Sequence, residues 1–172
     1  FTNIGSEQYF IQKNNATKGD LNCAWSSNLI IKLITSLIFA LFAPYIATLF
    51  NYQHLIPALL TIAFLPFVNA LSNGQIYQYK KDLNYKKFVL VSAVSKFFGS
   101  ISAIVMAIML KNYWALIIGT MVGAAAYVFL SYFIIKQRAS FALKDWQQQF
   151  QFSKWIILKS LVGHIRAKFD SW

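Results

Sequence analysis

The stretch LNCAWSSNLIIKLITSLIFALFAPYIATLF (Leu21–Phe50) has thirty positions and contains one charged residue, Lys32. A helix needs about 20 apolar residues to cross the hydrocarbon core of a bilayer. Because the stretch is longer than that, it predicts a membrane-spanning helix that tilts or protrudes. We expect Pro44 to bend the far end of this helix.

Further apolar stretches follow at short intervals. We expect additional spans at residues 55–79, 85–110, 113–135 and 152–172. The chain is 58% apolar and 12% charged, whereas roughly a quarter of the residues in soluble proteins are charged. The sequence therefore predicts an all-α polytopic membrane protein, with residues 1–172 in a single transmembrane domain. Because the chain begins at Phe1 and stops at Trp172 inside an apolar segment, we expect it to be a fragment of a longer membrane protein.

The lysines are distributed unequally between alternate loops. Ten Lys and Arg residues fall in or beside the loops at 12–20, 78–88 and 136–154, whereas the intervening connections contain only Lys111. Such an imbalance is typical of multi-pass proteins of the bacterial inner membrane, whose cytoplasmic loops carry the positive charge. We therefore expect the three lysine-rich loops to be cytoplasmic.

Several functions are disfavoured by composition and by the absence of motifs. The net charge of +11 does not indicate nucleic-acid binding, because the lysines flank apolar spans and do not form one basic face. Cys23 is the single cysteine, which excludes an internal disulfide. The five acidic residues are scattered, and no HExxH, GxSxG, Walker A or GxGxxG string occurs. We therefore expect neither an enzyme nor a bound cofactor.

Polar residues inside the expected spans are the best candidates for function, since charge within a bilayer is costly and normally faces a cavity or a partner. At about 100° per residue they form one stripe on each helix. The stripes are Asn28, Lys32, Thr35 and Ser36; Asn69, Ser72 and Asn73; Ser92, Ser95, Lys96, Gly99 and Ser102; and Lys159, Gly163, Arg166 and Asp170. Bundled together, they would enclose a cationic cavity for an anionic, hydroxyl-rich substrate. The competing interpretation is that these groups pack helices together or extend to the membrane surface.

The order of several short motifs resembles the first half of a known family, the Wzx-like oligosaccharide flippases of the multidrug/oligosaccharidyl-lipid/polysaccharide (MOP) superfamily. The matching stretches, in order, are NIGSEQYFIQKNNATKGDLNCAWSSNLIIKL, PYIATLF, NGQIYQYKKDLNYKKF, KNYWALIIGTMVGA and FSKWIILKSLVGHIRAKFDSW. The resemblance implies a two-lobed bundle of 12–14 helices, of which this chain would run from the end of helix two into helix seven. It also implies translocation of undecaprenyl-diphosphate-linked repeat units across the inner membrane, for O-antigen, capsule or exopolysaccharide assembly.

The resemblance suggests roles for the polar stripes. We expect Lys32 and Arg166 to attract the pyrophosphate, joined by Lys96 and Lys159 if these face inward. Asn28, Asn69 and Asn73 would contact sugar hydroxyls. Asp170 would hold Arg166 in place or take part in ion coupling. The expected partners are the lipid-linked oligosaccharide and membrane lipids, with a polysaccharide polymerase and a chain-length regulator as further candidates, and no nucleic acid.

Three alternatives remain open on the sequence. A multidrug exporter of the same superfamily would favour acidic residues in its cavity, whereas the stripes here are basic. A non-transporting membrane scaffold would use the stripes as packing seams. An integral glycosyltransferase or polymerase would need acidic residues and long outward loops, and the outward loops here are short.

Overall fold

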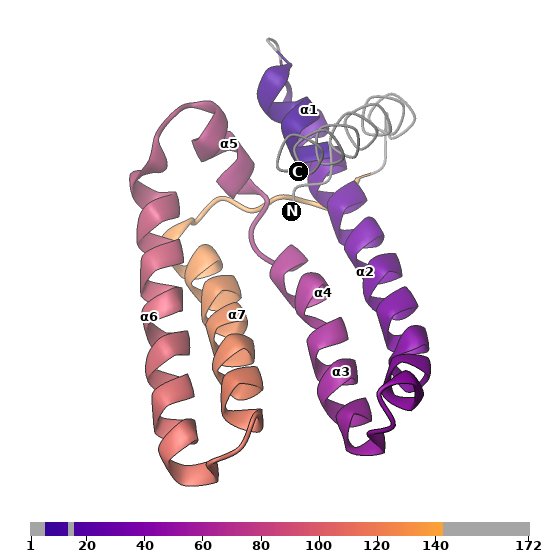
Figure 1. The fold of residues 1–172 in the computed structure, drawn as a ribbon. Coiled ribbons are helices and arrows are strands. Elements are labelled where there is room, and N and C mark those ends of the chain that lie inside the picture. The colour runs from indigo at the N-terminus through magenta and orange to yellow at the C-terminus, as the bar shows by residue number, and fades with distance from the viewer. Residues whose placement is uncertain (1–5, 14–15, 143–172) are drawn as a thin grey trace, which may run out of the picture.

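The computed structural model describes residues 6–13 and 16–142, and all regular structure in these ranges is helical (Figure 1). The elements are α1 (Ser6–Gln12), α2 (Lys18–Leu49), the 3-10 turn η1 (Gln53–Leu55), α3 (Ile56–Ala63), α4 (Leu65–Ala70), α5 (Gln75–Lys81), α6 (Tyr85–Leu110) and α7 (Trp114–Ile134). Four segments are long and apolar enough to cross a membrane: Lys18–Leu49, Gln53–Ala70, Tyr85–Leu110 and Trp114–Ile134. The predicted fold class, an all-α polytopic membrane protein, is confirmed.

Helix α2 begins with a capping box. The Thr17 hydroxyl accepts a hydrogen bond from the backbone N–H of Asp20 at 3.3 Å, and the Asp20 carboxylate accepts one from the Thr17 N–H at 2.8 Å. These bonds satisfy N–H groups that have no partner within the helix. Lys13 also pairs with Asp20 at 2.7 Å, so the same carboxylate ties the end of α1 to the start of α2.

The second apolar stretch does not form one helix over residues 55–79. It is divided into η1, α3 and α4, and α5 is a separate short helix. Pro66 follows the break between α3 and α4, as expected for a residue that has no backbone N–H to continue the helical ladder. The second break, at Leu71–Gly74, is held from outside, because the Trp25 indole donates to the Ser72 carbonyl at 2.8 Å.

The spans form two groups, with α6 and α7 packed as one antiparallel pair and α2 packed against α3 and α4 (Figure 1). Three glycines let α6 and α7 approach closely. A Cβ at Gly99 would lie 3.0 Å from the Gly119 carbonyl oxygen and 3.0 Å from the Gly123 Cα, and a Cβ at Gly119 would collide with Ala103. Small residues at such an interface allow the helix backbones to pack closely in a membrane.

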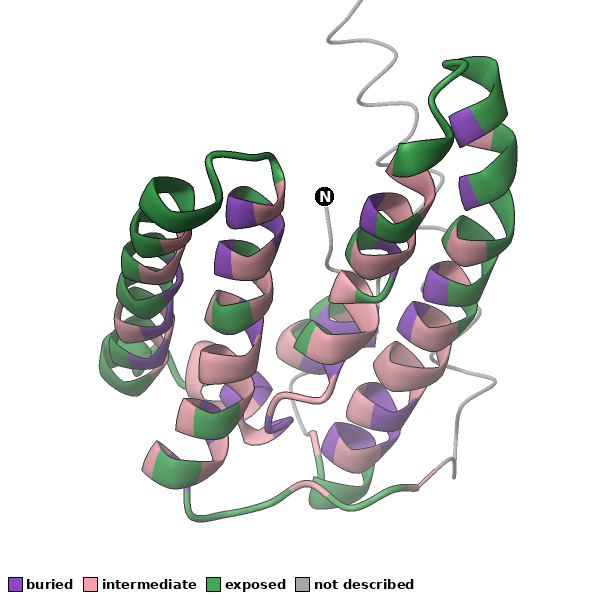
Figure 2. Ribbon diagram, turned by 90° about the horizontal axis from the view of Figure 1, so that it is seen from below, coloured by how far each residue is buried: buried purple, intermediate pink, exposed green. Residues whose placement is uncertain are grey.

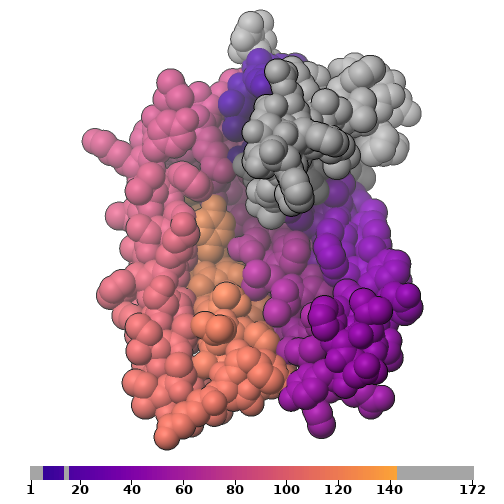
Figure 3. Space-filling view, in the orientation of Figure 1, coloured from indigo at the N-terminus to yellow at the C-terminus, as the bar shows by residue number. Residues whose placement is uncertain are grey.

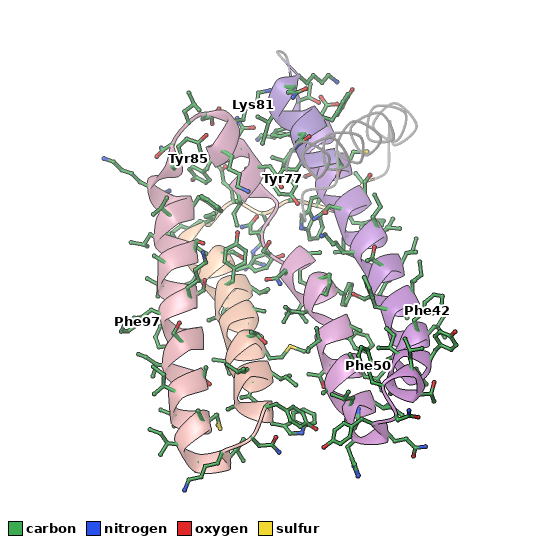
Figure 4. The ribbon with its side chains drawn as sticks, viewed as in Figure 1. Phe42, Phe50, Tyr77, Lys81, Tyr85 and Phe97 are labelled. Atoms are coloured by element: carbon green, nitrogen blue, oxygen red, sulfur yellow. The ribbon has the colours of Figure 1, made fainter. Side chains whose placement is uncertain are left out.

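The outer surface of the bundle is strongly apolar. Large side chains such as Phe133, Leu41 and Phe129 are more than three-quarters exposed, and Phe42 and Phe97 point away from the bundle on opposite sides (Figure 4). Buried positions face the neighbouring helices (Figure 2). Because a contiguous apolar surface of this extent is unfavourable in water, it is best explained by contact with lipid.

The lysine-rich segments meet at one end of the bundle. The starts of α2 and α6, the α5–α6 turn and the end of α7 all lie at the same end, while the turn between α6 and α7, which contains Lys111, lies at the other (Figure 1). The alternation of charge along the chain is therefore a separation of charge in space.

Candidate functional site

A cleft lined by apolar, polar and charged side chains lies between the two groups of helices. It consists of two cavities of about 610 and 320 Å³, here called the outer and the inner cavity. They adjoin, because Asn69, Lys80 and Tyr127 line both of them. Figure 3 shows the surface hollowed between α6 and the α3–α4 segment, with α7 set back between them.

The inner cavity brings together charged groups from three helices. Lys32 reaches it from α2, Lys80 from α5 and Glu7 from α1. Lys32 is 8% exposed and Glu7 is 4% exposed. Burying such groups is costly unless they are paired, and one pair is present: the Lys80 ammonium lies 2.6 Å from a carboxylate oxygen of Glu7.

Lys32 is the unmatched charge of the inner cavity. Within residues 6–13 and 16–142 its ammonium makes no hydrogen bond or ion pair. A largely buried ammonium that faces a cavity and has no directly bonded partner there is an attractive site for an anion.

Uncharged polar groups complete the inner wall. The Asn28 side-chain amide donates a hydrogen bond to the Tyr77 hydroxyl at 2.8 Å. Tyr77 belongs to α5, outside the four spans, and burial raises the pKa of its phenol above the ordinary value. The hydroxyl therefore stays neutral and can hydrogen-bond to a ligand as well as to Asn28.

The outer cavity is larger and more apolar, with a polar strip along α6. Lys96, Ser92 and Ser95 line it from α6, and Thr120 lines it from α7. The Ser95 hydroxyl donates to the Ser92 carbonyl at 3.0 Å, whereas Lys96 is exposed. A hydroxyl-rich group with an apolar attachment would match this lining.

The structure brings together four of the eight residues singled out from the sequence. Asn28 and Lys32 line the inner cavity, Lys96 lines the outer cavity, and Asn69 lines both. Asn73 lines neither of them and is 1% exposed. Its side chain instead donates to the carbonyl oxygens of Ile135 and Gln137. Lys159, Arg166 and Asp170 lie outside the described residues.

Sequence reasoning missed Glu7, Lys80, Tyr77 and Tyr127. In the sequence, Lys80 falls within the lysine-rich loop at 78–88, and Glu7 lies before the first expected span. The available signal was the scarcity of acidic residues, since Glu7 is one of only five in the chain and lies close to Ile4 and Phe10. Its partner, seventy-three positions away, had no local signal.

The cleft offers charged and hydrogen-bonding groups to a ligand. Lys32, Lys80 and Lys96 supply ammonium groups from α2, α5 and α6, and amides and hydroxyls lie between them. In the part of the chain that the structure describes, no cluster of His, Cys, Asp and Glu could hold a metal ion. The arrangement suits an anionic ligand with hydroxyl groups.

Comparison with known proteins gives one match. No curated protein and no solved structure matched the chain. The family model described as "Polysaccharide biosynthesis protein" matches residues 1–171, nearly the whole chain. This match agrees with the resemblance noted from the motifs. The chain therefore belongs to the polysaccharide biosynthesis protein family.

Proposed function

We propose that this chain is part of a flippase that moves undecaprenyl-diphosphate-linked oligosaccharide repeat units across the bacterial inner membrane. The units would serve O-antigen, capsule or exopolysaccharide assembly. The proposal assigns transport, and not catalysis, to the membrane domain.

The observation that carries the proposal is the cleft between the two helix groups. Lysines from three different helices line one continuous hollow in a bundle whose outer surface suits lipid. A diphosphate is held by ammonium groups through charge-assisted hydrogen bonds. The sugars would meet Asn28, Asn69 and the hydroxyls of α6. Membership of the polysaccharide biosynthesis protein family supports a ligand of this kind.

The position of Lys80 supports entry of the substrate from the lysine-rich end of the bundle. Lys80 lies at the lysine-rich end of the bundle and lines both cavities. If that end is cytoplasmic, as the positive-inside rule predicts, the cleft is reached from the side on which lipid-linked units are assembled. The neighbouring Lys81 and Lys87 would also attract anionic headgroups.

The test uses the source strain with the chromosomal gene deleted. Lipid-linked repeat units are extracted, and the leaflet in which they reside is determined with a membrane-impermeant sugar-modifying reagent. We expect complete, unpolymerised units to accumulate in the cytoplasmic leaflet and to return to normal when the gene is restored. Normal polymer without an accumulated intermediate, in a strain lacking related exporters, would contradict the proposal.

The same strain tests the site. Restoration with Lys32→Ala should leave the units accumulated, because the buried ammonium is lost. Lys86→Ala is the matched control, since Lys86 is exposed and lies outside both cavities. Equal export by both variants at equal abundance would remove Lys32 from the site.

A further inference from the structure

Glu7 is an unexpected residue in a cavity suited to anions. It enters the inner cavity from α1, a short helix outside the four spans, and its carboxylate is almost fully buried. The charged and titratable groups that line this cavity with it are Lys32 from α2, Tyr77 and Lys80 from α5, and Tyr127 from α7. An anionic ligand placed there would be repelled by the Glu7 carboxylate.

Lys80 is the residue for which Glu7 and a ligand would compete. Its ammonium is 2.6 Å from the Glu7 carboxylate and 4.5 Å from the centre of the Phe88 ring. Because Lys80 lines both cavities, a headgroup bound at their junction would meet the same ammonium. A diphosphate offers several oxygens and more than one negative charge, so it can displace a single carboxylate.

Glu7 also connects the cavity to the position of α1. The next residue of α5, Lys81, donates hydrogen bonds to the carbonyl oxygens of Phe10 and Lys13 at the end of α1. Two neighbouring lysines therefore hold α1 on α5. The Lys80–Glu7 ion pair lies in the cleft, whereas the hydrogen bonds of Lys81 do not. A ligand can therefore break the ion pair and leave the Lys81 hydrogen bonds intact.

We infer that Glu7 is an internal counter-ion of the substrate site. Without substrate its carboxylate neutralises Lys80, and the anionic headgroup takes Lys80 from it and loosens α1. With Glu7 in place the inner cavity holds two ammonium groups, Lys32 and Lys80, and one carboxylate. A monoanion cannot compete well with Glu7 for Lys80, whereas a diphosphate can bind both ammonium groups. Glu7 thereby sets the selectivity for multiply charged headgroups. The choice of a diphosphate ligand rests on the proposed function.

Binding of inorganic pyrophosphate to the detergent-purified intact protein, measured by titration calorimetry, tests the inference. Glu7→Gln should tighten pyrophosphate binding by roughly tenfold, because the competing charge is gone. Asp82→Asn is the matched control: it changes the net charge equally and lies at the end of α5, the helix that carries Lys80, but it is exposed and outside both cavities. It should leave the affinity within about twofold of the wild type.

A charge exchange separates a binding role from a purely structural one. The double variant Glu7→Lys with Lys80→Glu keeps an ion pair between α1 and α5. The double variant should have higher abundance and thermal stability than Lys80→Glu alone. It should still bind pyrophosphate weakly, because position 80, which lines both cavities, then carries a carboxylate in place of the ammonium. Unchanged or weaker binding in a folded Glu7→Gln protein, or wild-type binding in the exchanged pair, would overturn the inference.

A measurement on the wild type covers the case in which Glu7→Gln does not fold. Pyrophosphate should increase amide hydrogen exchange in Ser6–Gln12, while sodium chloride at the same ionic strength should not. No change in α1 at saturating pyrophosphate would overturn the inference. These assays measure pyrophosphate binding, whereas the leaflet assay measures transport. A failure of the counter-ion role would therefore leave the leaflet result unchanged, and a failure of the flippase proposal would leave the binding results unchanged.

Discussion

The side-chain nitrogen of Asn73 lies 2.7 Å from the carbonyl oxygen of Gln137, so the loop before α5 is bonded directly to the chain that follows α7. The same nitrogen donates to the Ile135 carbonyl at 3.0 Å, and the Asn73 backbone N–H donates to the Ser131 hydroxyl. Asn73 is fully enclosed. It therefore joins the two groups of helices at the lysine-rich end of the cleft.

Replacing Asn73 by Ala should destabilise the protein by about 1–3 kcal/mol, because the buried Ile135 carbonyl and the Gln137 carbonyl, whose hydrogen bond is partly buried, lose their donor. Denaturation of the purified protein in detergent measures the loss. The control is Asn84→Ala, since the exposed Asn84 side chain makes no capping bond at the start of α6. Equal stability of the two variants would show that the Asn73 bonds do not hold the groups together.

The buried ammonium of Lys32 should lower the stability of the folded protein although it is needed for export. Replacing it by Met removes a largely buried ammonium that has no partner among the described residues, so the melting temperature should stay the same or rise. Export in the deletion strain should fall at the same time. Lys96→Met, at an exposed position, should leave the melting temperature nearly unchanged. A marked drop in stability for Lys32→Met would indicate that Lys32 is a structural residue.

The α6–α7 interface should be sensitive to a single methyl group. Gly119→Ala places a Cβ against Ala103 and should lower the melting temperature and the abundance in membranes, because overpacking typically costs about 1–3 kcal/mol. Adding Ala103→Gly should recover part of the loss, because it removes the Ala103 Cβ but leaves the Ala103 Cα and N at 2.9 and 3.0 Å from the new methyl group. Gly19→Ala is the control, since its Cβ would meet only the Thr17 hydroxyl at an ordinary 3.5 Å. Failure of the double variant to recover would place the strain elsewhere.

The orientation of the bundle can be read by cysteine labelling in intact cells. In a Cys23→Ser background, an impermeant maleimide should label Lys111→Cys from the periplasmic side. It should label Lys86→Cys only after the membrane is opened. The expectation follows from the separation of the lysines between the two ends. The reverse pattern would invert the proposed entry side of the cleft.

Much of the fold was predictable because it follows from local properties. The apolar stretch at Leu21–Phe50 predicts a span whatever surrounds it, since a lipid-exposed backbone must satisfy its own hydrogen bonds as a helix. The division of residues 55–79 was not predicted. Pro66 marks the first break in the sequence, but the break at Leu71–Gly74 is held by Trp25, a residue of another helix.

Part of the candidate site was predictable because helical periodicity is also a local property of the chain. Helical periodicity placed Asn28 and Lys32 on one face of α2, and both line the inner cavity. Asn73 looked equivalent to Asn69 in the sequence. The chain turns between them, so Asn69 stays on α4 beside the cleft and Asn73 enters a loop whose carbonyl partners come from beyond α7.

The sequence by itself determined that this is a helical membrane protein with its positive charges gathered at one end, because hydropathy and loop charge act within a short stretch of chain. Only the tertiary structure decided which charges meet. Glu7 and Lys80 are seventy-three residues apart and form one ion pair, whereas Lys32 is left facing the cleft. Pairing between side chains that are distant in the sequence depends on how the helices pack, and it cannot be predicted from the composition of either segment.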